Sequence, residues 1–209
     1  MINTRRQEKG HRWFAFCYSR FIASAEERHW GEPRRRVFNG LEGRVLEVGV
    51  GSGTSLSYYP PDVQVVATEP DPHMLKRARE RLRELGATNV EIQQAPAERL
   101  PFDDASFDHA VCTWVLCTVD DLDQTLAEVR RVLKPEGTFR FMEHVRNDQS
   151  RFWATAQNVI APVWRWMGAG CRLTQRTDRV IEGAGFRFDW VERVPGWLQP
   201  VIYGVARSA

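Results

Sequence analysis

Long hydrophobic runs are missing from this sequence of 209 residues. No segment approaches the roughly 18 continuous apolar residues that a membrane span requires, so we expect no transmembrane segment. We also expect no secretory signal peptide, because the apolar stretch around Trp13, Phe14 and Phe16 is short and no small-residue cleavage site follows it. The sequence therefore predicts a cytoplasmic protein and leaves peripheral contact with a membrane open.

Cysteine is scarce, and its spacing excludes the common cysteine motifs. The four residues are Cys17, Cys112, Cys117 and Cys171. They form neither a CxxC pair nor a Cys/His cluster at zinc spacing, so neither a redox motif nor a metal site is predicted. We interpret Cys112 and Cys117 as packing residues.

A strong charge of one sign is also missing, because 29 Lys and Arg stand against 27 Asp and Glu. The basic residues gather at residues 1–36, where nine Lys and Arg face four Asp and Glu. This segment includes Arg34-Arg35-Arg36, which could belong to a nucleic-acid surface. We interpret the triplet as a solvated face and predict no nucleic-acid partner.

The order of apolar runs predicts one compact α/β unit. From residue 44 onward, strand-like runs alternate with helical periodicity, which is typical of βαβ units and a parallel sheet. Asp71-Pro72 resembles a helix start and Gly86 a helix end, whereas residues 134–137 read as the end of a helix over 122–133. The expected strands are residues 44–49, 63–68, 90–95, 106–112, 138–143, 186–194 and 201–207.

Two aromatic segments flank or interrupt this pattern. Residues 1–40 are predicted to form an N-terminal helical cap before a domain at residues 41–209. Each aromatic segment could be a helix packed on the core or a cover over a ligand pocket, because aromatic stripes at helical spacing serve either purpose. The first contains Trp13, Phe14, Phe16, Tyr18, Phe21 and Ile22, and the second Phe152, Trp153, Trp164, Trp166 and Met167.

A glycine-rich turn follows the first strand and is the most informative part of the chain. Glycines at positions 49, 51 and 53 stand at every second residue behind Glu47. A dinucleotide fingerprint needs a sixth-position glycine, and counting from Gly49 places Thr54 there, so a nicotinamide cofactor is disfavoured. The sequence resembles instead the first motif of class I methyltransferases that use S-adenosylmethionine (SAM) and release S-adenosylhomocysteine (SAH).

This resemblance implies a cofactor site. It places Glu47 against the amino-acid part of SAM, with Gly49, Gly51 and Gly53 making room for it. Glu69, 18 residues past Gly51, fits the acid that accepts hydrogen bonds from the ribose hydroxyls, because a carboxylate offers only acceptors. The remaining residues that the resemblance assigns to the cofactor are Pro70, Ala97, Glu98 and Thr113. Many relatives carry Asp where Pro96 stands, so adenine recognition falls to Glu98 or backbone atoms.

Further segments narrow the resemblance. The runs at residues 111–119, 128–137, 141–145, 170–174 and 202–204 resemble the alkyl thiol methyltransferases of the methyltransferase-like group. The resemblance implies a Rossmann-like, doubly wound, mostly parallel seven-stranded sheet with helices on both faces and an antiparallel last strand. It also implies methyl transfer to a small, hydrophobic acceptor, with a thiol favoured because part of it is thiolate near pH 7.

His144 is the candidate general base, because it ends the fifth strand at the edge where ligands of open α/β sheets bind. It could equally hold the loop through hydrogen bonds. Asp120 is a helix N-cap candidate rather than a catalytic acid. Methyl transfer from SAM requires no enzyme nucleophile, so no covalent role is expected for Cys112 or Cys117.

Three other functions stay open at this point. The acceptor could be a quinone precursor or a phospholipid amine, whose enzymes would share this cofactor site. A nucleic-acid methyltransferase is disfavoured, because the expected Asn/Asp-Pro-Pro-aromatic motif is replaced by Cys112-Thr113-Trp114-Val115. A non-catalytic SAM-binding protein would carry the same motifs. The sequence leaves the oligomeric state open.

Overall fold

The computed structural model of the chain describes residues 23–167, 170–196 and 199–209. Strands and helices alternate through most of this range, as the apolar pattern predicts. The elements are α3 (Ala23–Phe38), β1 (Arg44–Val48), the short 3-10 helix η2 (Leu56–Tyr58), β2 (Gln64–Thr68), α4 (Pro72–Leu85), β3 (Val90–Gln93), β4 (Phe107–Thr113), α5 (Leu122–Val132), β5 (Leu133–His144), α6 (Arg151–Met167), α7 (Thr177–Gly183), β6 (Phe186–Val194) and β7 (Val201–Ser208).

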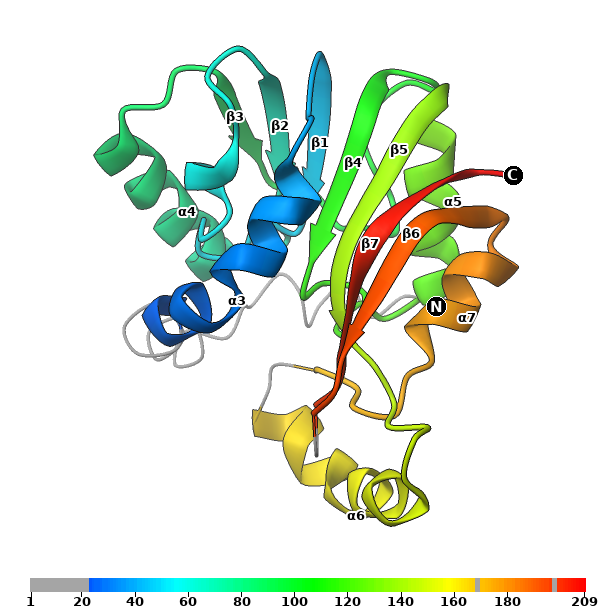
Figure 1. Cartoon of the computed structure of the whole chain (residues 1–209). Helices are drawn as coiled ribbons and strands as arrows, with labels where there is room; N and C mark the ends of the chain where they lie inside the picture. Colours follow the sequence, from blue (N-terminus) through cyan, green and yellow to red (C-terminus); the bar gives the residue numbers. More distant parts are fainter. Residues whose placement is uncertain (1–22, 168–169, 197–198) are drawn as a thin grey trace.

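The seven strands form one sheet in the order β3-β2-β1-β4-β5-β7-β6 (Figure 1). Strands β1 to β5 pair in parallel, whereas β7 is antiparallel to both β5 and β6. The chain moves outward from β1 to β2 and β3, then returns to the other side of β1 with β4. This reversal confirms the doubly wound sheet with an antiparallel last strand, and ligands bind beside such a reversal at the carboxyl ends of the strands.

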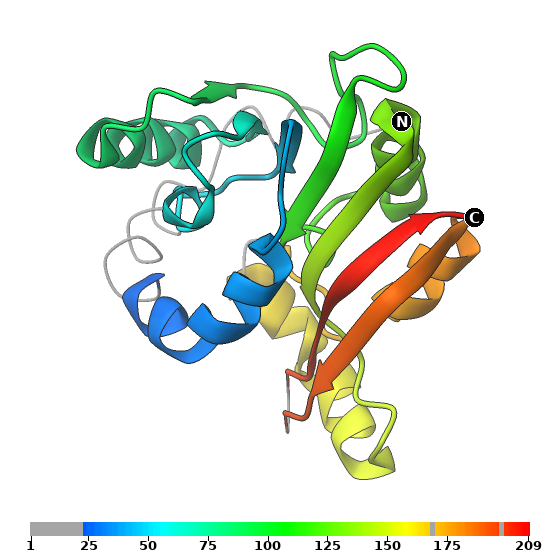
Figure 2. The ribbon, with the colours of Figure 1, turned by 45° about the horizontal axis from the view of Figure 1, so that its top comes forward.

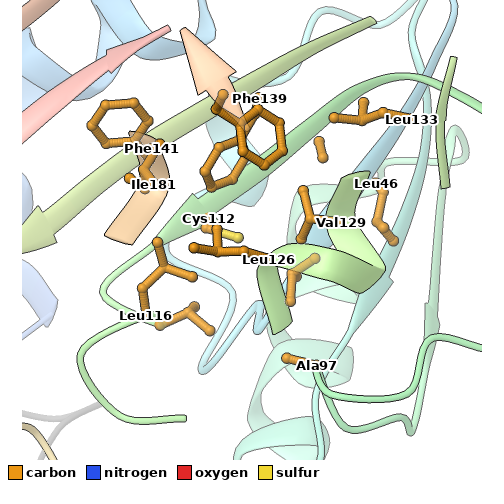
Figure 3. Close-up of a cluster of buried hydrophobic side chains, with 14 of the residues drawn as sticks. Leu46, Ala97, Cys112, Leu116, Leu126, Val129, Leu133, Phe139, Phe141 and Ile181 are labelled. Carbon is orange, nitrogen blue, oxygen red and sulfur yellow. The ribbon is translucent and has the colours of Figure 1, made fainter. Parts of the chain in front are cut away.

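Helices cover both faces of the sheet, as predicted. On one face, Leu126 and Val129 of α5 lie over Cys112 and Phe139 of the central strands, in the cluster drawn in Figure 3. On the other face, the end of α3 packs mainly on β5 and β7, and α4 packs on β3. Because helices cover both faces, β1 and β4 are buried along almost their whole length, which is typical of parallel sheets.

Helix α6 is set apart from these layers. Figures 1 and 2 show it beyond the carboxyl ends of the parallel strands, extending away from the sheet. Phe152 is 72% exposed there, so it is neither a core residue nor a buried cover over a pocket. Trp164, in contrast, packs on Cys117, Cys171 and Leu173.

The expected aromatic cover in residues 13–22 lies outside the described residues. In the described part of the N-terminal segment, Val37 and Phe38 of α3 are fully buried against the sheet. This end of α3 is therefore a core helix. Among the helices of the described residues, none has the length and apolar character needed to cross a membrane.

Two local predictions meet different outcomes. The N-cap of α4 is confirmed, because Asp71 Oδ1 accepts hydrogen bonds from the His73 and Met74 amides at 2.8 and 3.2 Å. The end of α5, at Val132, lies one residue from the prediction, but the start of the next strand is predicted wrongly, because residues 134–137 form an irregular part of β5 rather than a segment that closes the helix. Leu133 pairs with Phe107, and the next pairing joins Thr138 to His109, so the residues between them bulge from the ladder.

Candidate functional site

The glycine turn after β1 forms a loop with left-handed backbone. Gly49, Gly51 and Gly53 have φ angles of 69°, 58° and 85°, which residues other than glycine rarely adopt. A Cβ on Gly49 would lie 2.6 Å from the Val115 side chain, whereas a Cβ on Gly51 would meet no atom within 4 Å. Gly49 therefore permits packing within the protein, and Gly51 leaves open space for a ligand to approach the backbone.

Glu69 spans this loop from the end of β2. One carboxylate oxygen accepts a hydrogen bond from the Gly51 amide and the other from the Asp71 amide, each at 2.9 Å. These two bonds hold the carboxylate beside the open space at Gly51. Burial raises the pKa of Glu69 to about 7, although the two backbone hydrogen bonds oppose this shift. The carboxylate is thus oriented to accept further hydrogen bonds, as its predicted role requires.

Glu47 lies deeper, inside β1, and is 1% exposed. Neither of its carboxylate oxygens makes a well-formed hydrogen bond. Burial raises its pKa to about 7, while the nearby hydroxyls of Tyr59 and Ser55 and the charge of Arg34 lower it partly. Buried acceptors without a well-formed hydrogen bond are uncommon in proteins, and a ligand that donates hydrogen bonds to Glu47 would supply one.

Arg34 contradicts the interpretation of the arginine triplet as a solvated face. This residue is fully buried, and its charge acts on Glu47. Arg36 is exposed but forms an ion pair with Glu192 on β6 at 2.7 Å. The sequence pattern missed the first arginine because α3 lies on the sheet with one side inward, which places adjacent residues in different surroundings.

The other residues assigned to the cofactor lie around the same carboxyl edge. Thr113, at the end of β4, is 8% exposed, and its hydroxyl lies 3.3 Å from that of Ser55. Ala97 is buried. The Pro70 carbonyl accepts a hydrogen bond from Gln94. Contacts between these residues and adenine or ribose stay predictions.

Glu98 has a structural role that the sequence did not indicate. Its Oε1 accepts a hydrogen bond from the Asp120 amide at 2.9 Å, just before α5. The N-cap of α5 is Asp121, whose carboxylate accepts from Gln124, so the prediction of Asp120 as the cap is wrong by one residue. Only one carboxylate oxygen of Glu98 is engaged in this way.

His144 ends β5 beside the end of β4. Its ring stacks on Trp114 with centroids 4.3 Å apart, and Trp114 also makes an edge contact with Trp30 of α3. Trp114 has a φ angle of 62°, which is strained for a bulky residue and is often found at functional sites. An aromatic wall therefore lies next to Thr113.

Two cysteines complete this region, and the spacing along the sequence gave no sign of it. Cys117 Sγ lies 4.0 Å from His144 Nδ1 and 3.6 Å from Cys171 Sγ. The pKa of Cys171 lies below its usual range, because the Cys117 thiol and then His144 stabilise its thiolate. Cys112, in contrast, is buried in the core, and burial raises its pKa.

Glu143 holds the loop that carries Cys117, and it was not predicted as a functional residue. Its fully buried carboxylate accepts hydrogen bonds from three successive amides, those of Val115, Leu116 and Cys117, at 2.8, 2.9 and 3.3 Å. Burial raises its pKa to about 8, against the effect of these bonds. The one signal available in the sequence was that Glu143 stands next to His144, the candidate general base.

We expect Glu143→Ala to lower the free energy of unfolding by about 3 kcal/mol, because three buried amides lose a shared acceptor. Urea denaturation measures this change. Glu143→Gln retains one acceptor oxygen and should lose less. A loss below about 1 kcal/mol in the alanine variant would mean that the loop finds other partners.

Comparisons of the sequence with known proteins identify the family, and comparisons of the structure confirm the fold. The pattern that defines a methyltransferase domain matches residues 46–141. The thiol S-methyltransferase TMT1B of Homo sapiens is 33% identical, over 93% of this chain and 88% of that protein. The phosphatidylethanolamine N-methyltransferase of Cereibacter sphaeroides is 37% identical, over 78% and 80% of the two chains. The geranyl diphosphate C-methyltransferase of Streptomyces coelicolor A3(2), solved with Mg²⁺, geranyl diphosphate and SAH, superimposes with a TM-score of 0.67 at 16% identity, over 90% and 84% of the chains.

Proposed function

The chain belongs to the SAM-dependent methyltransferases, in the family of the human thiol S-methyltransferases, and from this premise we propose that its acceptor is a small hydrophobic thiol. The observation that carries this proposal is the similarity to TMT1B, which extends over 93% of the chain. It includes the segments after β4, after β5 and around Cys171, where an acceptor would lie, and not only the cofactor loop.

We propose that SAM binds at the carboxyl edge of β1 and β2. Glu69 accepts hydrogen bonds from the ribose hydroxyls, and Glu47 accepts from the amino group of the methionine part. The open space at Gly51 and the two acceptors of Glu47 without hydrogen bonds fit a ligand that brings both bulk and donors. When bound, SAM supplies a methyl group from a sulfonium centre.

The surroundings of the proposed acceptor position are apolar and rich in sulfur. Trp114 and His144 form a stacked wall, and Cys117, Cys171 and Trp164 pack beside it. Apolar pockets with few polar groups suit hydrophobic ligands. A thiol needs little catalytic help there, because its thiolate is already a strong nucleophile and positioning alone supplies much of the acceleration.

The role of His144 follows from this chemistry. A thiol of ordinary pKa does not require a strong base, so His144 would position groups around the acceptor rather than remove its proton. Its Trp114 stacking and its closeness to Cys117 support such a positioning role. General-base catalysis by His144 is the alternative.

The bacterial relative gives a specific reason to test a second acceptor class. The Cereibacter sphaeroides protein, at 37% identity, is named for methylation of the phosphatidylethanolamine amine. An acceptor panel with labelled SAM should compare a thiol, an alcohol and an amine of the same shape, such as the three benzyl compounds, together with phosphatidylethanolamine vesicles.

We expect the thiol to react faster than the matched alcohol and amine by more than about a hundredfold, because a thiolate is intrinsically a much stronger nucleophile than a neutral amine, and an alcohol is not deprotonated near pH 7. Heat-treated protein serves as the blank. Methylation of the lipid amine without thiol turnover would contradict the thiol assignment and leave the enzyme class intact.

We also propose a cytoplasmic enzyme that acts on a small molecule and not on nucleic acid. The arginine triplet offers no continuous basic surface, because Arg34 is buried and Arg36 is paired with Glu192. Recognition of nucleic acid requires a basic patch or stripe.

A further inference from the structure

Cys117, His144 and Cys171 bring three metal-ligating atoms together at the carboxyl edge of the sheet. Their ligand atoms all lie within 4.8 Å of one another. The three residues come from the loop after β4, the end of β5 and the segment after α6, so only the folded chain assembles them. The positioning role proposed for His144 uses its contacts with Trp114 and Cys117 and leaves the contact between Cys117 and Cys171 without a function.

The distances match those between ligands of one tetrahedral ion. With Zn–S and Zn–N bonds of about 2.3 and 2.0 Å, two sulfur ligands lie about 3.8 Å apart, and a sulfur and a nitrogen about 3.5 Å apart. The structure has 3.6 Å between the two sulfurs and 4.0 Å between Cys117 Sγ and His144 Nδ1. The third pair, Cys171 Sγ and the His144 ring nitrogen, lies within 4.8 Å. Side-chain shifts of up to about 1 Å would complete the geometry.

The local structure holds these ligands before any ion binds. The Glu143 carboxylate fixes the Cys117 backbone by accepting a hydrogen bond from the Cys117 amide. The amide of Arg172, the residue after Cys171, donates to the Cys117 carbonyl at 2.8 Å. The His144 ring is oriented by its stacking on Trp114. Cys117 and Cys171 are buried, at 2% and 7% exposed, whereas His144 is only partly buried. The cluster is therefore more accessible on the side of His144. Preorganised ligands of this kind favour metal binding.

We propose that Cys117, His144 and Cys171 bind a thiophilic divalent cation, Zn²⁺, whose fourth position takes the acceptor thiolate. Two sulfurs and an imidazole favour zinc over harder cations such as Mg²⁺. Three protein ligands with one position open to water or substrate are typical of catalytic zinc, and in the described part of the chain no further His, Cys, Asp or Glu joins the group. This part of the proposal rests on the proposed thiol acceptor.

The chemical step balances without another reactant. A thiol that ligates zinc loses its proton to solvent and stays a thiolate near pH 7. Its sulfur then forms a bond to the methyl carbon, while the bond between that carbon and the sulfonium sulfur breaks and leaves its electron pair on that sulfur. The neutral thioether is a weaker ligand than the thiolate, so the product can leave.

The test begins with the metal alone. Protein reduced and freed of metal by a chelator is titrated with Zn²⁺, and with Co²⁺ as a coloured probe. We expect one ion per chain and a sulfur-to-cobalt charge-transfer band, both lost in Cys117→Ser and Cys171→Ser and weakened in His144→Gln. Cys112→Ala is the matched control, since Cys112 lies in the core and should leave metal binding unchanged (Figure 3). Circular dichroism and SAH binding show that each variant is folded.

A second arm separates the metal from the acceptor. Adding the thiol to the Co²⁺ protein should shift the band, and chelation should lower thiol methylation by about tenfold or more at pH 7, with the difference fading above the thiol pKa. No stoichiometric metal in the reduced protein, or equal binding by Cys171→Ser, overturns the site. A bound ion whose spectrum ignores the thiol, or chelated enzyme with full activity, overturns the role at the acceptor. If no thiol reacts in either form while another acceptor does, the proposed function fails and the metal result stands separately.

Discussion

Gly51→Val should lower the affinity for SAH by more than about a hundredfold, which corresponds to about 3 kcal/mol of binding free energy. A Cβ at this position meets no protein atom within 4 Å, so the new side chain would enter the space proposed for the cofactor. It would also stand beside the Gly51 amide that binds Glu69. Isothermal titration calorimetry with SAH measures the effect, and methylation activity should fall with it.

The chain contains a matched control for the backbone strain that valine introduces. Gly86, at the end of α4, has a φ angle of 63° against 58° for Gly51, and a Cβ there also meets nothing within 4 Å. Gly86→Val therefore carries a similar penalty for left-handed backbone without touching the site. We expect it to bind SAH like the unaltered protein. Equal loss in both variants would attribute the effect to strain, and normal binding by Gly51→Val would remove the cofactor from this loop.

Features set by neighbouring residues could be predicted from the sequence. The start of α4 is specified by the Asp71 side chain, which caps the helix, and by the ring of Pro72, and its end is specified by the left-handed backbone of Gly86. The glycine loop behaves in the same way, because positive φ angles at Gly49, Gly51 and Gly53 follow from local backbone preferences. Such signals act within a few residues and need no tertiary contact.

Features set by distant contacts could not be predicted in this way. Residues 134–137 contain Pro and Gly and read as a turn, yet pairing of Leu133 with Phe107 draws them into β5. Lys134 then forms an ion pair with Asp108 on the neighbouring strand at 2.6 Å. Tertiary pairing outweighs local turn preference here.

The cysteine and histidine cluster shows the same limit at the site. Cys117 and Cys171 are 54 residues apart, and their contact depends on how the segment after α6 returns to the sheet. Spacing rules for metal sites detect ligands that share a hairpin or a helix, and these residues share neither. The motifs of the cofactor loop were visible because one strand and one turn hold them together.

The pH dependence of cofactor binding should be steep, because two buried carboxylates must both be ionised to accept hydrogen bonds. Burial raises the pKa of Glu47 and of Glu69 to about 7. Arg34, Tyr59 and Ser55 oppose the shift at Glu47. At Glu69 the amides of Asp71 and Gly51 oppose it, and the charges of Asp71 and Glu47 add to it. With both carboxyls titrating near pH 7, SAH affinity should fall by about a hundredfold between pH 8 and pH 6.

The same two carboxyls give the stability of the ligand-free protein the opposite pH dependence. A carboxyl whose pKa is raised on folding favours the folded state while it is protonated, so this contribution is present below about pH 4.5 and lost as the pH rises through about 7. Between pH 6 and 8 the melting temperature of the ligand-free protein should therefore fall, while its increase on SAH binding grows.

Calorimetry across this range, in buffers of different ionisation enthalpy, should also detect net proton release on binding at pH 6. Glu69→Gln removes one of the two titrations and should halve the slope. An affinity for SAH that stays constant from pH 6 to 8 would show that neither carboxylate takes up the cofactor in its ionised form.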